Sequence, residues 1–346
     1  MSTIHFLNVL EGDCNIIQHD SKRVTVIDVS NAYNDYDTPE EIAAKQSQER
    51  KDRLQRTMVP SGKVDYKQKH TPDNPIEYLK GYDIQSIFRF IITHPDMDHI
   101  DGIRDLYEEF KIHNTWDTDN NKNISLDAYF GGYNQEDWKF YKNLRDGNFN
   151  DTARKTYYSG LNFSYFNEDY IKVLCPTPEL VQKSNESLGN YHDGSYVLLY
   201  CPPKANGGHW KILLAGDSHD ASWEHILKNY NAEVSNIDIL FAPHHGRDSN
   251  RNYGFLKVLK PRVVLFGNAS SDHLAYDAYR STDPNRQTLR ITNNQAGYVV
   301  IDINQEYFSI YVKNFDFARD FLNHRNWGQP NYSSKFNGYG LIQFNA

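Results

Sequence analysis

The sequence has few cysteines, no long apolar run and no excess of positive charge. Its three cysteines, Cys14, Cys175 and Cys201, are far apart and form no CxxC pair, so we expect buried free thiols rather than disulfides or a zinc ribbon. No stretch approaches the roughly 18 consecutive apolar residues that a membrane helix needs, and residues 1–10 have neither a basic leader nor a long apolar segment. These absences predict a soluble, cytoplasmic protein with no membrane segment.

The charge balance is acidic, because the 346 residues carry a formal net charge of -8. No global positive field therefore exists to hold nucleic acid by counterion release. A nucleic-acid substrate is not excluded, since part of the negative charge would lie at a metal site, where bound cations reverse its local sign. The 39% share of hydrophobic residues is typical of a globular protein with a sizeable core.

Apolar runs typical of strands dominate residues 1–31, and from residue 171 strands alternate with helices. This order predicts layered sheets flanked by helices. We expect one domain over residues 1–313, and a helix and strand over 314–346 that pack on the same domain.

Two polar stretches interrupt the pattern, and we interpret them as insertions. The first, at about residues 32–74, carries mixed charges at helical spacing over 40–56, which predicts a solvated helix. The second, at about 114–165, is typical of long loops with a helix near 135–144. Long excursions of this kind are often functional lids.

The most informative stretch, residues 94–101, reads His-Pro-Asp-Met-Asp-His-Ile-Asp and follows an apolar run typical of a strand. Neighbouring carboxylates repel one another and raise each other's pKa, so such a cluster is costly unless a divalent cation, or a pair of them, neutralises it. Two histidines and two aspartates within six loop positions have little structural use. The stretch therefore predicts metal binding.

Two later predicted strands also end in potential metal ligands. One leads into Gly216 and Asp217, and the other into Pro243-His244-His245-Gly246. Alone, Asp217 could be a helix N-cap and the histidine pair a loop feature. Because open sheets place ligand sites at the carboxyl ends of their strands, the joint pattern favours one shared metal centre.

The order of these motifs resembles that of the metallo-β-lactamase fold hydrolases, whose signature is HxHxDH followed by a later histidine, a bridging aspartate and a final histidine. With Asp96 in place of the second histidine and PHHG near the end, the sequence most resembles the hydrolase domain of the DNA-uptake competence channel and its stand-alone relatives. The resemblance covers roughly residues 1–31, 84–112 and 190–313. It implies an α/β fold, a four-layer αββα sandwich.

The resemblance also implies two divalent metal ions, zinc or manganese. It puts one ion on His94 and Asp96 and a second on Asp98 and His99, with Asp217 bridging the two. An aspartate-rich set of ligands is harder than an all-histidine one, which makes manganese a serious competitor to zinc.

Two ligand positions stay open in the sequence. Related family members place the final histidine directly before the glycine, which favours His245 as the ligand and leaves His244 facing the substrate. The middle ligand is either His192 or Asp193, with a slight preference for Asp193. Asp101, just outside the ligand run, could orient one of the ligand histidines.

Two cations would lower the pKa of a shared water, giving hydroxide at neutral pH, and would clamp the attacked and leaving oxygens. Arg247 would suit a phosphate clamp, although an exposed loop arginine is an equally good interpretation. We therefore expect a metal-dependent phosphodiesterase or nuclease in which Asp98, His244 and Arg247 serve catalysis.

Two other functions remain open. The same fold could hydrolyse an ester, lactone or thioester, since a fold does not fix the bond that is broken. A non-catalytic interaction module could instead keep metal only for structure, with no open coordination position.

Overall fold

The computed structural model describes residues 1–34, 66, 68–127, 130–149, 151–187, 190–249, 251–267, 274–281 and 287–346. The helix expected over residues 40–56 lies outside these ranges. Within them, every helix is too short or too polar to cross a bilayer.

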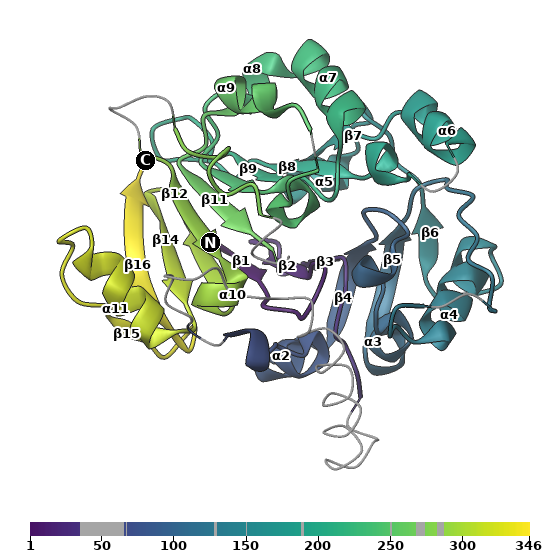
Figure 1. Cartoon of the computed structure of the whole chain (residues 1–346), viewed down its shortest axis with the longest axis horizontal. Coiled ribbons are helices and arrows are strands. Elements are labelled where there is room, and N and C mark those ends of the chain that lie inside the picture. The colour runs from purple at the N-terminus through teal and green to yellow at the C-terminus, as the bar shows by residue number, and fades with distance from the viewer. Residues whose placement is uncertain are drawn as a thin grey trace.

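Two mixed β-sheets form the centre of the molecule (Figure 1). The strands of the larger, ten-stranded sheet are, in spatial order, β15 (Tyr332–Ser333), β16 (Gly338–Asn345), β14 (Tyr307–Val312), β13 (Val299–Ile303), β1 (Ser2–Phe6), β2 (Asn15–Gln18), β3 (Val24–Ile27), β4 (Ser86–Ile91), β5 (Lys111–Trp116) and β6 (Ala153–Lys155). Pairing is antiparallel from β15 to β3 and parallel from β3 to β6.

The smaller sheet has six strands. In spatial order they are β12 (Leu289–Thr292), β11 (Val263–Phe266), β10 (Ile239–Phe241), β9 (Ile212–Leu214), β8 (Val197–Tyr200) and β7 (Ile171–Cys175). Strands β9 to β12 pair in parallel, whereas β8 is antiparallel to both of its neighbours.

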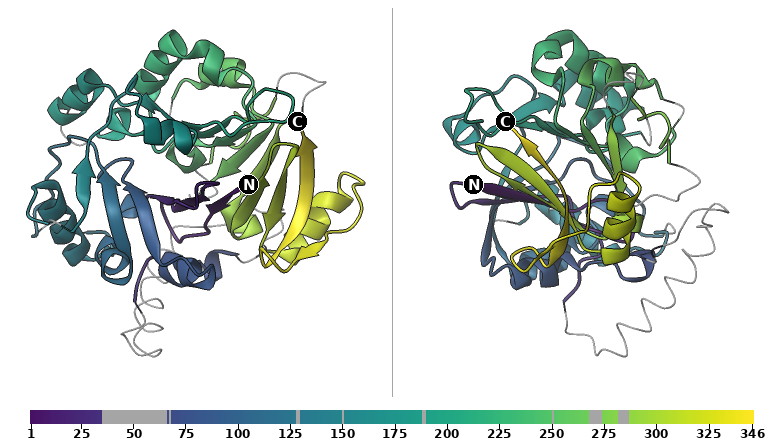
Figure 2. Two further views of the ribbon diagram at one scale, coloured as in Figure 1. Left: turned by 180° about the vertical axis from the view of Figure 1, so that it is seen from behind. Right: turned by 90° about the vertical axis from the view of Figure 1, so that its left-hand side faces the viewer.

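Helices cover the outer faces of both sheets (Figures 1 and 2). On the larger sheet these are α2 (Pro75–Gly81), α3 (Ile103–Glu109) and α4 (Gln135–Arg145). On the smaller sheet they are α6 (Pro178–Glu186), α7 (Asp220–Asn229), α8 (Asn231–Val234) and α9 (Leu256–Leu259). Three further helices, α5 (Ser164–Glu168), α10 (Asn293–Ala296) and α11 (Phe315–Asn323), contribute side chains to the core between the sheets.

The central core lies between the inner faces of the two sheets. It joins Ile91 and Trp116 of the larger sheet to Leu214 and Phe241 of the smaller one. Separate apolar clusters lie under the helices on each outer face. The chain is therefore an α/β protein of four layers, αββα, as the sequence predicted.

Residues 114–165 and 314–346 are additions to this core, and their secondary structure was predicted in part. The stretch 114–165 contains the expected helix, α4, and also β6, a strand that extends the parallel part of the larger sheet and was not predicted. The stretch 314–346 forms α11, β15 and β16, and β16 extends the larger sheet by pairing with β14.

The central strands of the smaller sheet, two of which lead to predicted ligands, are short apolar runs, buried on both faces. Strands β9, β10 and β11 consist only of leucine, isoleucine, valine and phenylalanine, and all of their residues are buried. Such runs are typical of parallel strands that are covered on both sides. Because the three strands run in the same direction, their carboxyl ends meet at one edge of the sheet.

Candidate metal centre

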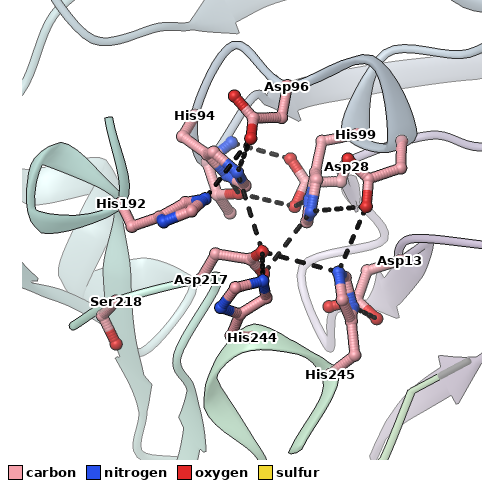
Figure 3. Close-up of polar contacts among 12 residues, drawn as sticks. Asp13, Asp28, His94, Asp96, His99, His192, Asp217, Ser218, His244 and His245 are labelled. Carbon is pink, nitrogen blue, oxygen red and sulfur yellow. Dashed lines mark hydrogen bonds and ion pairs between the residues drawn. The ribbon is translucent and has the colours of Figure 1, made fainter. Parts of the chain in front are cut away.

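Loops that follow strands of both sheets meet at one place, where their side chains point toward one another (Figure 3). His94 follows β4 of the larger sheet, whereas Asp217 and His245 follow β9 and β10 of the smaller sheet. All three side chains are buried. The arrangement joins the two sheets through polar groups at the end of the central core.

Several overlapping sets of histidine and aspartate side chains lie close enough to hold an ion, and two of these sets lie on either side of Asp217. We call His94, Asp96 and His192 the Asp96 group, and Asp98, His99 and His245 the Asp98 group. The structure thus brings together six of the seven metal ligands expected from the sequence, and adds His192.

Distances within the Asp96 group are those of atoms that could share one ion. Asp96 Oδ2 lies 3.3 Å from His192 Nε2 and 3.5 Å from His94 Nε2. His94 Nε2 lies 3.7 Å from Asp217 Oδ2. Ligand bonds of about 2.0–2.2 Å in a tetrahedral zinc site place neighbouring ligand atoms about 3.4 Å apart, close to these values.

The Asp98 group has similar spacing. Asp98 Oδ2 lies 3.4 Å from His245 Nε2 and 3.8 Å from His99 Nε2. Asp217 approaches both histidines, with Oδ1 3.4 Å from His99 Nε2 and Oδ2 3.5 Å from His245 Nε2. Asp217 is therefore placed to contact both groups through its two oxygens.

The strongest sign that these residues fit metal ions is a set of buried polar atoms without hydrogen bonds. Within the described part of the chain, the Nε2 atoms of His94, His99 and His245 and the Oδ1 atom of Asp217 have no hydrogen-bond partner. Buried polar atoms are almost always satisfied, because an unsatisfied one costs about 1–3 kcal/mol. Divalent cations would satisfy all four atoms at once.

Each histidine of the Asp98 group also contacts a carboxylate through its other ring nitrogen. His99 Nδ1 lies 2.8 Å from Asp28 Oδ2, and His245 Nδ1 lies 3.1 Å from Asp13 Oδ1. The hydrogen bond between His99 and Asp28 fixes the tautomer that leaves His99 Nε2 free to bind a metal, whereas the contact between His245 and Asp13 is electrostatic. Asp28 is held in turn by Thr93, whose backbone N–H and hydroxyl both donate to it at 2.7 Å.

Sequence reasoning did not assign roles to Asp13 or Asp28. Their positions could have suggested a role, because both lie in the first hairpin, which is part of the family resemblance. Asp13 precedes strand β2, and Asp28 directly follows strand β3. Asp101, the residue expected to orient a ligand, instead accepts the backbone N–H of Asn31 at 3.0 Å.

Backbone packing around the centre leaves no room for larger residues at two glycines. A Cβ atom on Gly12, whose φ is +75°, would lie 1.7 Å from the carbonyl oxygen of Asp98. A Cβ atom on Gly267 would lie 2.6 Å from Asp13 Oδ1 and 3.1 Å from His245 Cβ. These close approaches hold the Asp98 group in place.

The loop that carries the histidine pair is strained. His244 and His245 have φ values of 54° and 55°, in the left-handed region that non-glycine residues rarely adopt. Such conformations persist only where the surrounding structure imposes them, and they cluster at functional sites. The strain turns two adjacent side chains toward Asp217.

Opposite charges control protonation at the centre. Burial would raise the pKa of Asp217, but His245 and His99 outweigh burial and hold this pKa well below its usual range. Burial would lower the pKa of His99, but Asp217 and Asp28 raise it well above its usual range. The Asp217 carboxylate is thus ionised at neutral pH, which is the form that binds cations.

The structure separates the two candidates for the middle ligand. His192 belongs to the Asp96 group, whereas the carboxylate of Asp193 points to α7 and accepts the backbone N–H of Ser222 at 3.1 Å. In this structure His192, and not the preferred Asp193, lies beside Asp96. A one-turn 3-10 helix at His192–Gly194 sends the two side chains in different directions.

Both histidines of the PHHG segment face the centre. His245 lies in the Asp98 group, and His244 Nε2 lies 3.6 Å from Asp217 Oδ2. His244 Nδ1 lies 3.0 Å from Nε2 of His219, a residue that sequence reasoning missed although it stands two positions after Asp217. Arg247 is half-buried directly after this segment, and its backbone N–H donates to the His244 carbonyl at 2.8 Å.

No known family profile and no curated protein matches the sequence. Three of the solved structures that are similar at a distance are described below. Igni18, described as a novel metallo hydrolase from the hyperthermophilic archaeon Ignicoccus hospitalis, is 12% identical, with 87% of this chain and 100% of that chain covered and a TM-score of 0.44. YhfI of Bacillus subtilis, described as a metallo-beta-lactamase fold protein, is 9% identical, with 84% and 95% covered and a TM-score of 0.37.

A long form of RNase Z from yeast is 10% identical, with 86% of this chain and 41% of that chain covered and a TM-score of 0.40. This chain thus spans less than half of that protein. At such low identity, the αββα description of this chain depends on its own strand order and layers, and the description of the centre depends on its own geometry.

Proposed function

We propose that the chain is a dinuclear metal-dependent hydrolase that cleaves phosphodiesters, nucleic acids among them. The observation that carries this proposal is the meeting of two ligand groups on one shared carboxylate, Asp217. Among the described residues, the Nε2 atoms of His94, His99 and His245 there are buried and without hydrogen bonds. Two divalent cations, zinc or manganese, would be held by the Asp96 group and the Asp98 group. When bound, such a pair supplies an activated water and neutralises charge on the oxygens of the bond that is cleaved.

The residues of the chain prepare this chemistry. Asp28 and Asp13 hold His99 and His245 with Nε2 directed inward, so little reorientation is needed when a cation binds. Asp217 lies between the groups, with Oδ1 near His99 and Oδ2 near both His245 and His94. His244, 16% exposed and 3.6 Å from Asp217 Oδ2, would face the substrate.

Support for a phosphodiester substrate comes from the motif variant. Asp96 in place of a histidine is the feature shared with the competence-channel hydrolase domain, and it makes the ligand set harder, which suits manganese. Arg247, directly after the PHHG segment, would bind a phosphate oxygen.

The test is a screen of metal against substrate. Protein loaded with Mn²⁺ or Zn²⁺ should cleave bis(p-nitrophenyl) phosphate, single-stranded DNA or RNA, and Asp98→Ala should lower this activity by at least about a thousandfold, since a metal ligand is lost. Asp127→Ala, which changes an exposed carboxylate, should leave the activity unchanged. Inactivity on every phosphodiester beside robust cleavage of a chromogenic ester or lactone would overturn the proposed substrate class.

A further inference from the structure

The two central carboxylates of the HPDMDH motif have different partners. Asp98 faces the histidines His99 and His245. Asp96 uses Oδ2 in the same way, toward His94 and His192, but its Oδ1 forms an ion pair with the ammonium group of Lys122. Of the two motif carboxylates, Asp96 thus has its charge balanced by a lysine.

Hydrogen bonds of the Lys122 backbone hold the residue in this position. Arg145 Nη1 of α4 donates to the Lys122 carbonyl at 2.6 Å, and the Lys122 backbone N–H donates to Asn120 Oδ1 at 3.2 Å. The preceding residue, Asn121, donates from its backbone to Asn185 Oδ1 at 3.0 Å. The segment is therefore anchored at several points, and only 18% of the Lys122 side chain is exposed.

We propose that Lys122 neutralises Asp96 and fixes Oδ2 as its ligand atom, so that the Asp96–Lys122 pair acts as a charge-neutral ligand where the motif that this sequence resembles has a histidine. The inference rests on the proposed metal centre. A neutral ligand at this position leaves the centre with two uncompensated ligand carboxylates, Asp98 and Asp217.

The proposal has a direct consequence for charge. If Asp96 were replaced by a neutral side chain, the lysine would remain as an unpaired positive charge beside the cation, and Coulomb repulsion across a few ångströms of partly buried space would weaken binding. If the lysine were removed together with the carboxylate, the repulsion would disappear. The two substitutions should therefore compensate each other.

The experiment measures metal binding without substrate, by calorimetry and by competition with a chromogenic chelator, for Mn²⁺ and for Zn²⁺. We expect Asp96→His to weaken the more weakly held ion by about 10- to 100-fold, and Asp96→His with Lys122→Met to bind that ion within about threefold of the unsubstituted protein. The matched control is Asp96→His with Lys142→Met, which removes a nearby lysine whose ammonium donates to Asn123 Oδ1 at 3.1 Å. This control should bind as weakly as Asp96→His alone.

Asp96→Asn, with and without Lys122→Met, gives a second pair of variants that keep the shape of the side chain, in case histidine disturbs the fold. Thermal unfolding of each protein checks that it is folded. Equal affinities of Asp96→His and Asp96→His/Lys122→Met would overturn the inference, as would equal rescue by Lys142→Met. A protein that binds two ions with the expected pattern but cleaves no phosphodiester would overturn the proposed substrate class and leave this inference standing.

Discussion

The Asp96 group and the Asp98 group each take two side chains from the loop after β4 but differ in how they are supported. In the Asp98 group, both histidines are buried and each has a carboxylate at Nδ1. In the Asp96 group, the Asp96 side chain is 28% exposed and His192 is 18% exposed, and the supporting charge comes from a lysine. Because Asp98 is 26% exposed and His94 is fully buried, the two groups differ less in depth than in support, which is carboxylates at Nδ1 in one group and a lysine in the other.

The two groups differ in support because their supporting residues belong to different parts of the chain. Asp13 and Asp28 belong to the first hairpin of the core fold, whereas Lys122 belongs to the stretch between β5 and α4. The core thus prepares one half of the centre, and an added segment completes the other. We expect the Asp98 group to be the tighter and more rigid half.

The largest expected effect comes from removing one histidine from each group. His99→Ala leaves the buried carboxylate of Asp28 without its partner, so it should lower the free energy of unfolding of the metal-free protein by about 3 kcal/mol. His192→Ala, at a position that is 18% exposed, should cost less than about 1 kcal/mol. Urea unfolding in the presence of a chelator measures both values.

Titration of the metal-loaded variants with a chelator extends the same comparison. His192→Ala should lose the ion that the unsubstituted protein releases first, and His99→Ala the ion released last. Similar unfolding free energies for the two variants, or loss of the same ion in both, would show that the two halves are not distinct.

A smaller effect is expected from the residues that orient ligands. Asp28→Asn keeps the shape of the side chain but removes the charge that His99 contacts, so we expect the affinity of the Asp98 group for Zn²⁺ to fall by about 10- to 100-fold. Asp101→Asn, which changes a carboxylate of the same loop that binds the Asn31 backbone, is the control and should change the affinity less than about threefold. If both variants bind Zn²⁺ equally well, Asp28 does not support the centre.

The sequence predicted the ligand-bearing loops because each follows an apolar strand, and strand order brings such loops together. It could not decide between His192 and Asp193, because a single turn of 3-10 helix determines which neighbour faces the centre. Lys122 was beyond prediction for another reason. Its contact with Asp96 spans 26 residues, and its position depends on Arg145 and Asn185 rather than on local pattern.

The smallest expected effect concerns the support beneath the Asp96 group. Asp117, at the start of the segment that carries Lys122, is fully buried and accepts hydrogen bonds from Tyr141 at 3.1 Å and from Arg154 at 3.1 Å. Burial nevertheless raises the pKa of Asp117 to about 6. Asparagine at this position would keep the shape of the side chain and remove its titration.

The sign of the pH effect follows from this raised pKa. Since the folded protein holds the Asp117 proton more tightly than the unfolded chain, whose pKa is about 3.9, ionisation between about pH 4 and pH 6 lowers the free energy of unfolding, on the order of 2 kcal/mol in all. The difference in unfolding free energy between the unsubstituted protein and Asp117→Asn should therefore shrink by this amount from pH 4 to pH 7, measured by urea unfolding with a chelator present. If the difference in unfolding free energy stays constant or grows with pH, Arg154 and Tyr141 compensate the buried charge of Asp117 in full. The added segment would then support the Asp96 group as firmly as the core supports the Asp98 group.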